Sequence, residues 1–184
     1  MKKSLASLLA GVALIGASAA QAYDGFVGIN YINMEQHNQL RGIGFLAGED
    51  RFTTGDIMVR VGGQINEYFL SELRLGATAL PEEDGALRFG NDYYVGPFVR
   101  VQKPMGIFTP YAGIGYMWLK ERLKVEGGGS ATERLGDMTY GIGFDLALGE
   151  RLGLNAEFFV LSYDGEPRGQ IDRKGPSLGV FYKF

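Results

Sequence analysis

The amino-acid sequence predicts an all-β fold, namely an eight-stranded antiparallel up-and-down β-barrel that spans a lipid bilayer as a transmembrane domain. Three observations support this fold. Apolar and polar residues alternate with period 2 in one segment after another, as in strands whose two faces meet different surroundings. After the N-terminal region, the chain has no apolar stretch of the roughly 18 residues that a transmembrane helix needs. The connections between the alternating segments are in turn short and long, which is typical of such barrels.

Residues 1–22 have the features of a secretory signal peptide. Lys2 and Lys3 give a positive start, and residues 5–15 form an apolar run. This run is shorter than the roughly 20 residues that a membrane anchor needs, so export with cleavage is expected. The small-x-small cleavage pattern and the new N-terminus are supplied by Ala20, Ala22 and Tyr23. The chain therefore divides into a cleaved signal peptide, 1–22, and one barrel domain, 23–184.

Five segments alternate cleanly enough for both faces to be assigned. In 56–65, for example, Ile57 and Val59 share one face, and Asp56 and Arg60 share the other. The same pattern recurs in 69–79, 93–103, 136–149 and 177–184. Three further segments carry apolar residues on both faces, so their inward face stays open: 23–34, 108–119 and 152–163. The result is eight strands of about 9–11 residues, the length that a tilted transmembrane strand requires.

The connections fall into two sets by length. Short links are expected at 66–68, 103–107 and 149–151, and long polar ones at 35–54, 80–91, 120–135 and 164–173. With an even number of strands and the N-terminus in the periplasm, all short links lie on the periplasmic side. Short periplasmic turns and long outer loops are typical of bacterial outer-membrane barrels.

The charged residues of the alternating segments gather on one face, which is expected to point into the barrel lumen. A soluble barrel would do the reverse, whereas an Arg or Lys that faces lipid costs about 2–4 kcal/mol at the bilayer midplane. Eight strands enclose a lumen just wide enough to be filled by side chains, so these charges are expected to form a network that plugs it. The five acids and four bases are Asp56, Arg60, Glu72, Arg74, Arg100, Asp137, Asp145, Glu157 and Lys183.

Four stretches of the chain resemble the small OmpA/OmpX-like family of outer-membrane β-barrel domains in Gram-negative bacteria. They are "VGGQINEYFLSELRLGA", "TPYAGIGYMW", "YGIGFDLALGERLGLNAEFFVLSYDG" and the terminal "GPSLGVFYKF". The resemblance implies residence in the cell outer membrane. In that family a terminal aromatic belongs to the signal that the barrel assembly machinery reads, which implies this role for Tyr182 and Phe184.

No catalytic, cofactor or metal site is expected from the residue patterns. The one histidine, His37, falls in the expected first outer loop among amide side chains, whereas a hydrolase needs a histidine beside its serine. Ser130 and Ser162 lie toward the same rim, but no spacing joins them to His37. The acidic residues 82–84 lack the alternating ligand spacing of a calcium site. Cysteine is absent, so disulfides and thiolate metal sites are excluded.

The charge balance narrows the expected partners. Without Lys2 and Lys3, the chain has 16 basic and 21 acidic residues, a net charge of −5, and nothing in it favours nucleic acid. A monomer is expected, in contact with outer-membrane lipid and with an extracellular ligand at the outer loops as a candidate partner. Basic residues that lie in or beside the expected outer loops are placed to contact lipopolysaccharide phosphates: Arg41, Arg51, Lys120, Arg122 and Lys124.

Three functions fit a barrel of this kind. The favoured one is a structural or surface-interaction protein that acts through its outer loops. A narrow channel for ions or small apolar molecules is the first alternative, and a lipid A-modifying enzyme is the less favoured one. Because the expected lumen is filled by charged side chains, a wide pore is disfavoured.

Overall fold

The computed structural model describes residues 25–38, 50–84, 87–125, 130–165 and 169–184. Within these ranges the chain forms nine β-strands: β1 (Gly25–Asn38), β2 (Asp50–Gln64), β3 (Phe69–Leu80), β4 (Glu82–Asp84), β5 (Leu87–Gln102), β6 (Phe108–Val125), β7 (Ser130–Ala147), β8 (Leu152–Gly165) and β9 (Gly169–Lys183). In the part of the chain so described, no helix is long and apolar enough to cross a membrane. The predicted signal peptide, 1–22, and its cleavage site lie outside the described residues.

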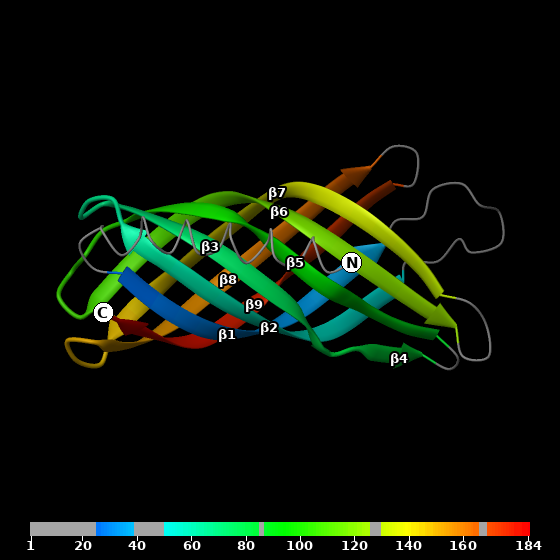
Figure 1. Cartoon of the computed structure of the whole chain (residues 1–184), viewed down its shortest axis with the longest axis horizontal. Coiled ribbons are helices and arrows are strands. Elements are labelled where there is room, and N and C mark those ends of the chain that lie inside the picture. Colours follow the sequence, from blue (N-terminus) through cyan, green and yellow to red (C-terminus); the bar gives the residue numbers. More distant parts are fainter. Residues whose placement is uncertain (1–24, 39–49, 85–86, 126–129, 166–168) are drawn as a thin grey trace, which may run out of the picture.

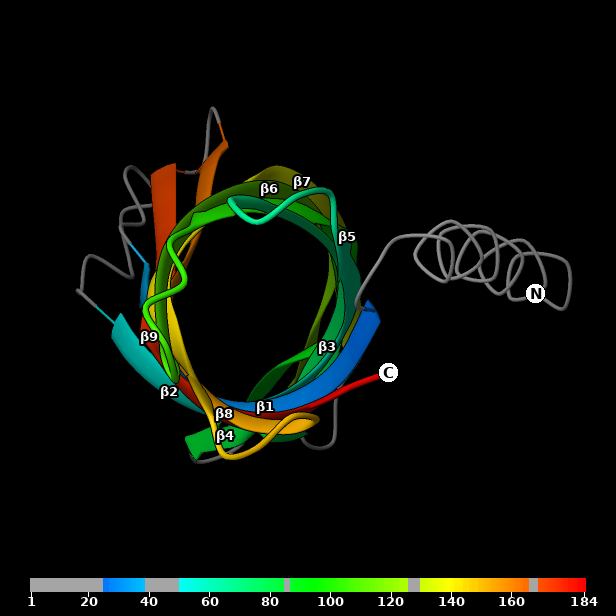
Figure 2. The same cartoon turned by 90° about the vertical axis from the view of Figure 1, so that its left-hand side faces the viewer.

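Eight of the strands close into an antiparallel barrel. Neighbours follow the order β3-β2-β1-β9-β8-β7-β6-β5, and pairing of β3 with β5 closes the ring. The ring is seen end-on in Figure 2 and from the side in Figure 1. The short β4 pairs with β5 beyond Pro81, where β3 has ended, so it continues a hairpin and adds no member to the ring. The predicted eight-stranded barrel is therefore confirmed.

Three short connections lie together at one end of the barrel, which we call the turn end. They join β2 to β3, β5 to β6 and β7 to β8, and the C-terminus lies at the same end (Figure 1). In the first, the Asn66 side chain accepts backbone hydrogen bonds from Tyr68 and Phe69, both 2.9 Å. In the second, Gly106 has a φ of 68°, a conformation that favours glycine. The predicted short links are confirmed.

At the opposite end, which we call the loop end, the strands are longer than the alternation predicts. Several ranges that the sequence places in outer loops belong to strands in the structure: 35–38, 50–54, 87–91, 120–125, 130–135 and 169–173. Lys120, for example, pairs with Arg134 in an unbroken β6–β7 register. The reason is that water surrounds both faces beyond the bilayer, so hydrogen-bonded strands continue there without apolar alternation.

The structure assigns an inward face to every barrel strand. Even-numbered side chains point into the lumen in β1, β2, β3 and in β5 from Tyr94 onward, and odd-numbered ones do so in β6, β7, β8 and β9. This settles the three segments whose inward face stayed open. In β5, a register irregularity between Asn91 and Tyr93 changes the phase, so that Asn91 is buried and Tyr93 is exposed.

The outer wall of the barrel is apolar. Exposed aliphatic side chains cover much of it, among them Ile29, Ile57, Val59, Leu75, Val99, Ile114, Ile142, Leu154, Leu178 and Val180. Exposed aromatic side chains lie toward both ends, among them Tyr93, Tyr116 and Trp118 toward the loop end and Phe69, Tyr182 and Phe184 toward the turn end. An apolar band bordered by aromatic residues is the surface that a bilayer requires.

Candidate functional site in the barrel lumen

The inward side chains form apolar and polar layers along the barrel axis. At the turn end, Phe26, Leu70 and Phe181 form a small apolar cluster. A charged layer follows, and then a larger apolar cluster made of Ile32, Met34, Met58, Tyr94, Met117, Leu119, Phe159 and Leu161. Nearer the loop end, buried polar side chains return: Thr54, Asp56, Asn91 and Arg173.

Glu72 on β3 is the centre of the charged layer. Arg60 on β2 donates two hydrogen bonds to its carboxylate, Nε to Oε2 at 3.0 Å and Nη2 to Oε1 at 2.8 Å. Arg74 donates from Nε to Oε2 at 2.9 Å, and Nε of Arg100 lies 3.4 Å from Oε1. One buried carboxylate therefore faces three guanidinium groups, so further acids must balance the charge.

Glu157 on β8 supplies the second carboxylate. Arg74 donates from Nη1 and Nη2 to its two oxygens, at 2.6 and 2.9 Å, and the Tyr111 hydroxyl donates to Oε2 at 2.6 Å. In the ring, β3 and β8 are separated by three strands in either direction, so they face each other across the lumen. Arg74, which also contacts Glu72, is therefore a crossbar between opposite walls.

Asp145 on β7 completes the charge balance. Its Oδ2 accepts a 2.6 Å hydrogen bond from Arg100 Nη2, and its Oδ1 accepts one of 2.7 Å from Asn155. Asn30 on β1 donates to Asn155 at 2.7 Å and to Ser177 on β9 at 2.9 Å. With these bonds, the network takes residues from all eight strands of the ring and pairs three arginines with three carboxylates.

The space for this network comes from inward glycines. The Arg74 guanidinium carbon lies 3.4 Å from the centre of the Phe98 ring, within the range of a cation–π interaction. A Cβ on Gly113 or on Gly115 would collide with that ring. A Cβ on Gly141 would likewise collide with the Glu157 carboxylate, so these glycines admit the large side chains from neighbouring strands.

A closed antiparallel ring with an apolar wall and a charged lumen indicates a barrel of the bacterial outer membrane, and the family comparison decides the matter. Residues 6–184 match the model of the outer membrane protein beta-barrel domain. The chain belongs to this family. Membership implies residence in the outer membrane, with the turn end toward the periplasm. Export through a cleaved signal peptide stays a prediction.

Solved outer-membrane barrels share the fold. Neisserial surface protein A aligns with a TM-score of 0.71 at 13% identity, over 87% of this chain and 97% of its own. Ail of Yersinia pestis, in complex with the heparin analogue sucrose octasulfate, aligns at 0.54 and 13% identity over 88% and 100%. OprG of Pseudomonas aeruginosa aligns at 0.51 and 16% over 89% and 96%. No curated protein matches the sequence. At these identities the likeness shows the fold alone.

The structure brings six of the nine predicted lumen charges into one network: Arg60, Glu72, Arg74, Arg100, Asp145 and Glu157. Asp56 is buried nearer the loop end, where Thr54 donates to it at 3.3 Å. Asp137 has the inward phase but is only half-buried, and it accepts a hydrogen bond from the Met138 backbone. Lys183 lies at the turn end beside Phe181.

The sequence interpretation missed the buried Arg173, which was assigned to an outer loop. Arg173 is 2% exposed and donates to Asn91 at 3.2 Å. Arg173 has an odd number, like the inward-facing Ser177 and Phe181. Extending the alternation of the last strand from 177 back to 173 therefore predicts that Arg173 faces the lumen. The neutral members of the network carried no charge signal: Asn30, Tyr111, Asn155 and Ser177.

The predicted terminal aromatics lie on the outer wall at the turn end. Tyr182 is 38% exposed and its hydroxyl accepts a 3.1 Å hydrogen bond from Arg151. Phe184 is 61% exposed, and its backbone N–H donates to the Gly25 carbonyl at 2.9 Å. Their role as an assembly signal stays a prediction.

His37 lies in β1 and not in a loop, and the register places it nearer to Ser162 than the sequence suggested. His37 pairs with Asp172 of β9, and Asp172 pairs with Ser162 of β8. In a hydrolase the histidine lies between the serine and the carboxylate, whereas here the acidic residue is in the middle. The side chains of these three residues are outside the described part of the structure. Among the described residues, no group of three metal-ligating side chains forms a metal site.

Proposed function

We propose that this chain is a closed monomeric barrel that serves as a structural and surface-interaction protein of the outer membrane. The observation that carries the proposal is the charged network, which joins all eight strands and crosses the lumen through Arg74. A packed apolar cluster follows on its loop side. Two successive layers of side chains that fill the lumen favour a structural protein over a channel.

Planar-bilayer recording tests this proposal against the channel alternative. The refolded wild-type protein is expected to give no single-channel steps, because Arg74 and Glu157 span the lumen. The double variant Arg74→Ala with Glu157→Ala removes both partners of this ion pair, so neither charge stays buried without the other. Because the apolar cluster still fills the lumen on the loop side, the double variant is expected to stay closed as well. Regular steps from the wild-type protein, unchanged in the double variant, would favour the channel and contradict the proposal.

The strands that project at the loop end support a role in surface interaction. β6 (Phe108–Val125) and β7 (Ser130–Ala147) each have 18 residues, whereas about 9–11 suffice to cross the bilayer. Lys120 and Asp92, both half-buried near the start of the projecting part, form a 2.9 Å ion pair. The strands therefore continue beyond the lipid as a hydrogen-bonded sheet. Such a sheet holds the residues at the loop end in fixed positions, where a partner outside the cell can bind them.

Lipopolysaccharide is the partner that we propose at the outer rim. Trp118 is 53% exposed on the wall, and Lys120 follows it on the same face of β6. Arg134, which is exposed, pairs with Lys120 across the strands. Cations just beyond the aromatic residues are at the depth of lipid phosphates. The likeness to Ail, which was solved in complex with the heparin analogue sucrose octasulfate, is a further reason to test a polyanionic partner.

Thermal unfolding in two membranes tests the lipid proposal. Lipopolysaccharide added to phospholipid is expected to raise the unfolding temperature of the wild type more than that of the variant Lys120→Gln with Arg134→Gln. Lys103→Gln in a periplasmic turn is the charge-matched control and is expected to behave as wild type. An equal rise in the wild type and the double variant would contradict the proposed contact with lipopolysaccharide.

An enzymatic role is not proposed, because the register of His37, Asp172 and Ser162 does not favour a triad.

A further inference from the structure

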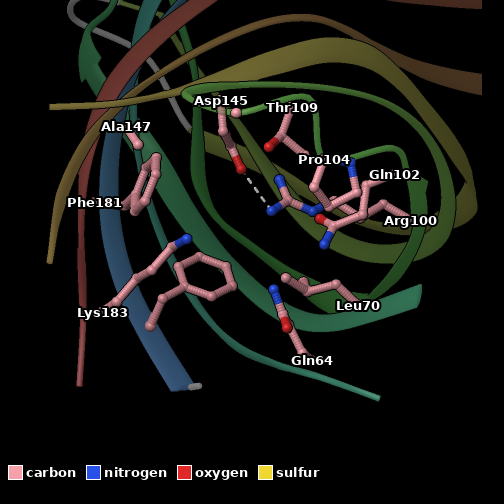
Figure 3. Close-up of a pocket in the computed structure, with 12 residues that line it drawn as sticks. Gln64, Leu70, Arg100, Gln102, Pro104, Thr109, Asp145, Ala147, Phe181 and Lys183 are labelled. Carbon is pink, nitrogen blue, oxygen red and sulfur yellow. Dashed lines mark hydrogen bonds and ion pairs between the residues drawn. The ribbon is translucent and has the colours of Figure 1, made fainter. Parts of the chain in front are cut away.

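A small cavity lies inside the periplasmic mouth of the barrel. Its volume is about 140 Å³, and its wall is partly apolar, with Phe26, Leu70 and Phe181 on one side. Polar side chains point into the same space, as Figure 3 shows for Gln64, Arg100, Gln102 and Lys183. An apolar cavity of about 150 Å³ holds a benzene ring, so the volume suits a ligand of similar size.

The polar side of the cavity offers unused hydrogen-bond donors. Arg100 is 3% exposed, and it uses Nη2 for Asp145 at 2.6 Å. Its Nη1 has no hydrogen-bond partner among the described residues. A buried guanidinium N–H without a partner costs free energy, and a ligand oxygen at this place would remove that cost.

The charge of the cavity is positive. Arg100 and Lys183 are its cations and Asp145 is its anion. Both oxygens of Asp145 already accept hydrogen bonds, from Arg100 and from Asn155. Within the described part of the chain, Lys183 forms no ion pair, and its ammonium lies 5.7 Å from the centre of the Phe181 ring. One positive charge is left for a ligand that enters from the periplasm.

We propose that this cavity binds a small organic monoanion, a carboxylate that carries a short apolar or aromatic group. The carboxylate lies between Arg100 Nη1 and Lys183, and the apolar group lies against Phe26, Leu70 and Phe181. Aromatic rings with a carboxylate match both the volume and the two-sided lining. This site is separate from the outer rim, and it neither requires nor provides passage through the lumen, because the charged network closes the cavity on its inner side.

Benzoate is the probe, and neutral benzamide of the same shape is its control. Each is titrated into the ¹⁵N-labelled mature chain in lipid nanodiscs, and amide shifts are followed by NMR. Saturable shifts are expected for benzoate at Leu70, Gly106 and Ala147, with clearly weaker binding of benzamide. Lys183→Gln is expected to weaken benzoate binding about fivefold, the effect of one partly exposed ion pair. Lys103→Gln, which removes the same charge outside the cavity, is expected to leave it unchanged.

A second variant separates binding from folding. Ala147→Leu fills the cavity without touching its charges, and it is expected to abolish the benzoate shifts while the heat-modifiable gel mobility of the barrel persists. Equal binding of benzoate and benzamide would overturn the proposal, because it would show no anion recognition. Shifts confined to lipid-facing amides would overturn it too, as would the absence of any saturable shift.

Discussion

The lumen and the outer wall of this barrel come from the same strands but meet opposite surroundings. Arg74 and Leu75 are consecutive in β3, yet Arg74 is fully buried among carboxylates and Leu75 is 39% exposed on the wall. In a water-soluble barrel the two environments would be exchanged. The strand itself has no preference between them, so the solvent outside decides which of two neighbouring residues faces inward.

The two regions also differ in how they tolerate change. On the wall each side chain meets fluid lipid, so any apolar group fits and only charge is costly. In the lumen each charged group depends on named partners, because removal of one partner leaves another charge buried without compensation. We therefore expect the lumen to respond to the loss of a single group and the wall to respond only to the gain of a charge.

The largest effect is expected from Glu72→Ala. This change leaves the guanidinium groups of Arg60, Arg74 and Arg100 without their shared carboxylate. Breaking a buried ion pair costs about 3–5 kcal/mol, so the free energy of unfolding should fall by at least that order. Urea titration of the barrel refolded in vesicles measures it. Glu67→Ala removes the same group from an exposed turn and should change little, and similar losses from both variants would refute a special role of the lumen.

The second effect concerns the wall. Leu75→Arg places a charge in hydrocarbon near the middle of β3, at a cost of about 2–4 kcal/mol. Ser71→Arg is the matched control, on the same strand and face but four residues nearer the periplasmic rim, where such a charge costs about 0–1 kcal/mol. Folded and unfolded fractions of both variants are compared by gel mobility with and without heating. If the two substitutions proved equally harmful, exposure of Leu75 to lipid would be the wrong interpretation.

The contrast between lumen and wall also sets how much can be predicted from sequence. Within the bilayer, alternation placed Arg60, Glu72, Arg74 and Arg100 on the inward face, because lipid penalises every exception. Outside the bilayer that penalty ends, which is why the outer parts of β6 and β7 were expected as loops. Arg173 was missed for the same reason.

The sequence pattern also does not predict which lumen residues pair with one another. Alternation gives the face of a residue but not its height in the barrel, which depends on the stagger between strands. Asp137 and Asp145 share the inward face of β7, yet only Asp145 lies at the height of Arg100. Register between distant strands, such as β3 and β8 across the lumen, has no counterpart in the local sequence.

The smallest effect on the folded barrel is expected from deletion of Phe184. The ring is 61% exposed, and the deletion removes one backbone hydrogen bond, to Gly25, so the free energy of unfolding of refolded protein should fall by only about 1 kcal/mol. If Phe184 and Tyr182 are read by the assembly machinery, however, the amount of barrel assembled in cells should fall strongly while export continues. Quantitative blots of outer-membrane and periplasmic fractions measure this.

Phe69→Ala is the control, because Phe69 is another exposed aromatic at the turn end but lies on β3. A loss of assembled protein in both variants would point to a general need for rim aromatics. A loss confined to the deletion separates recognition during assembly from stability of the finished barrel, since the wall itself tolerates the missing ring.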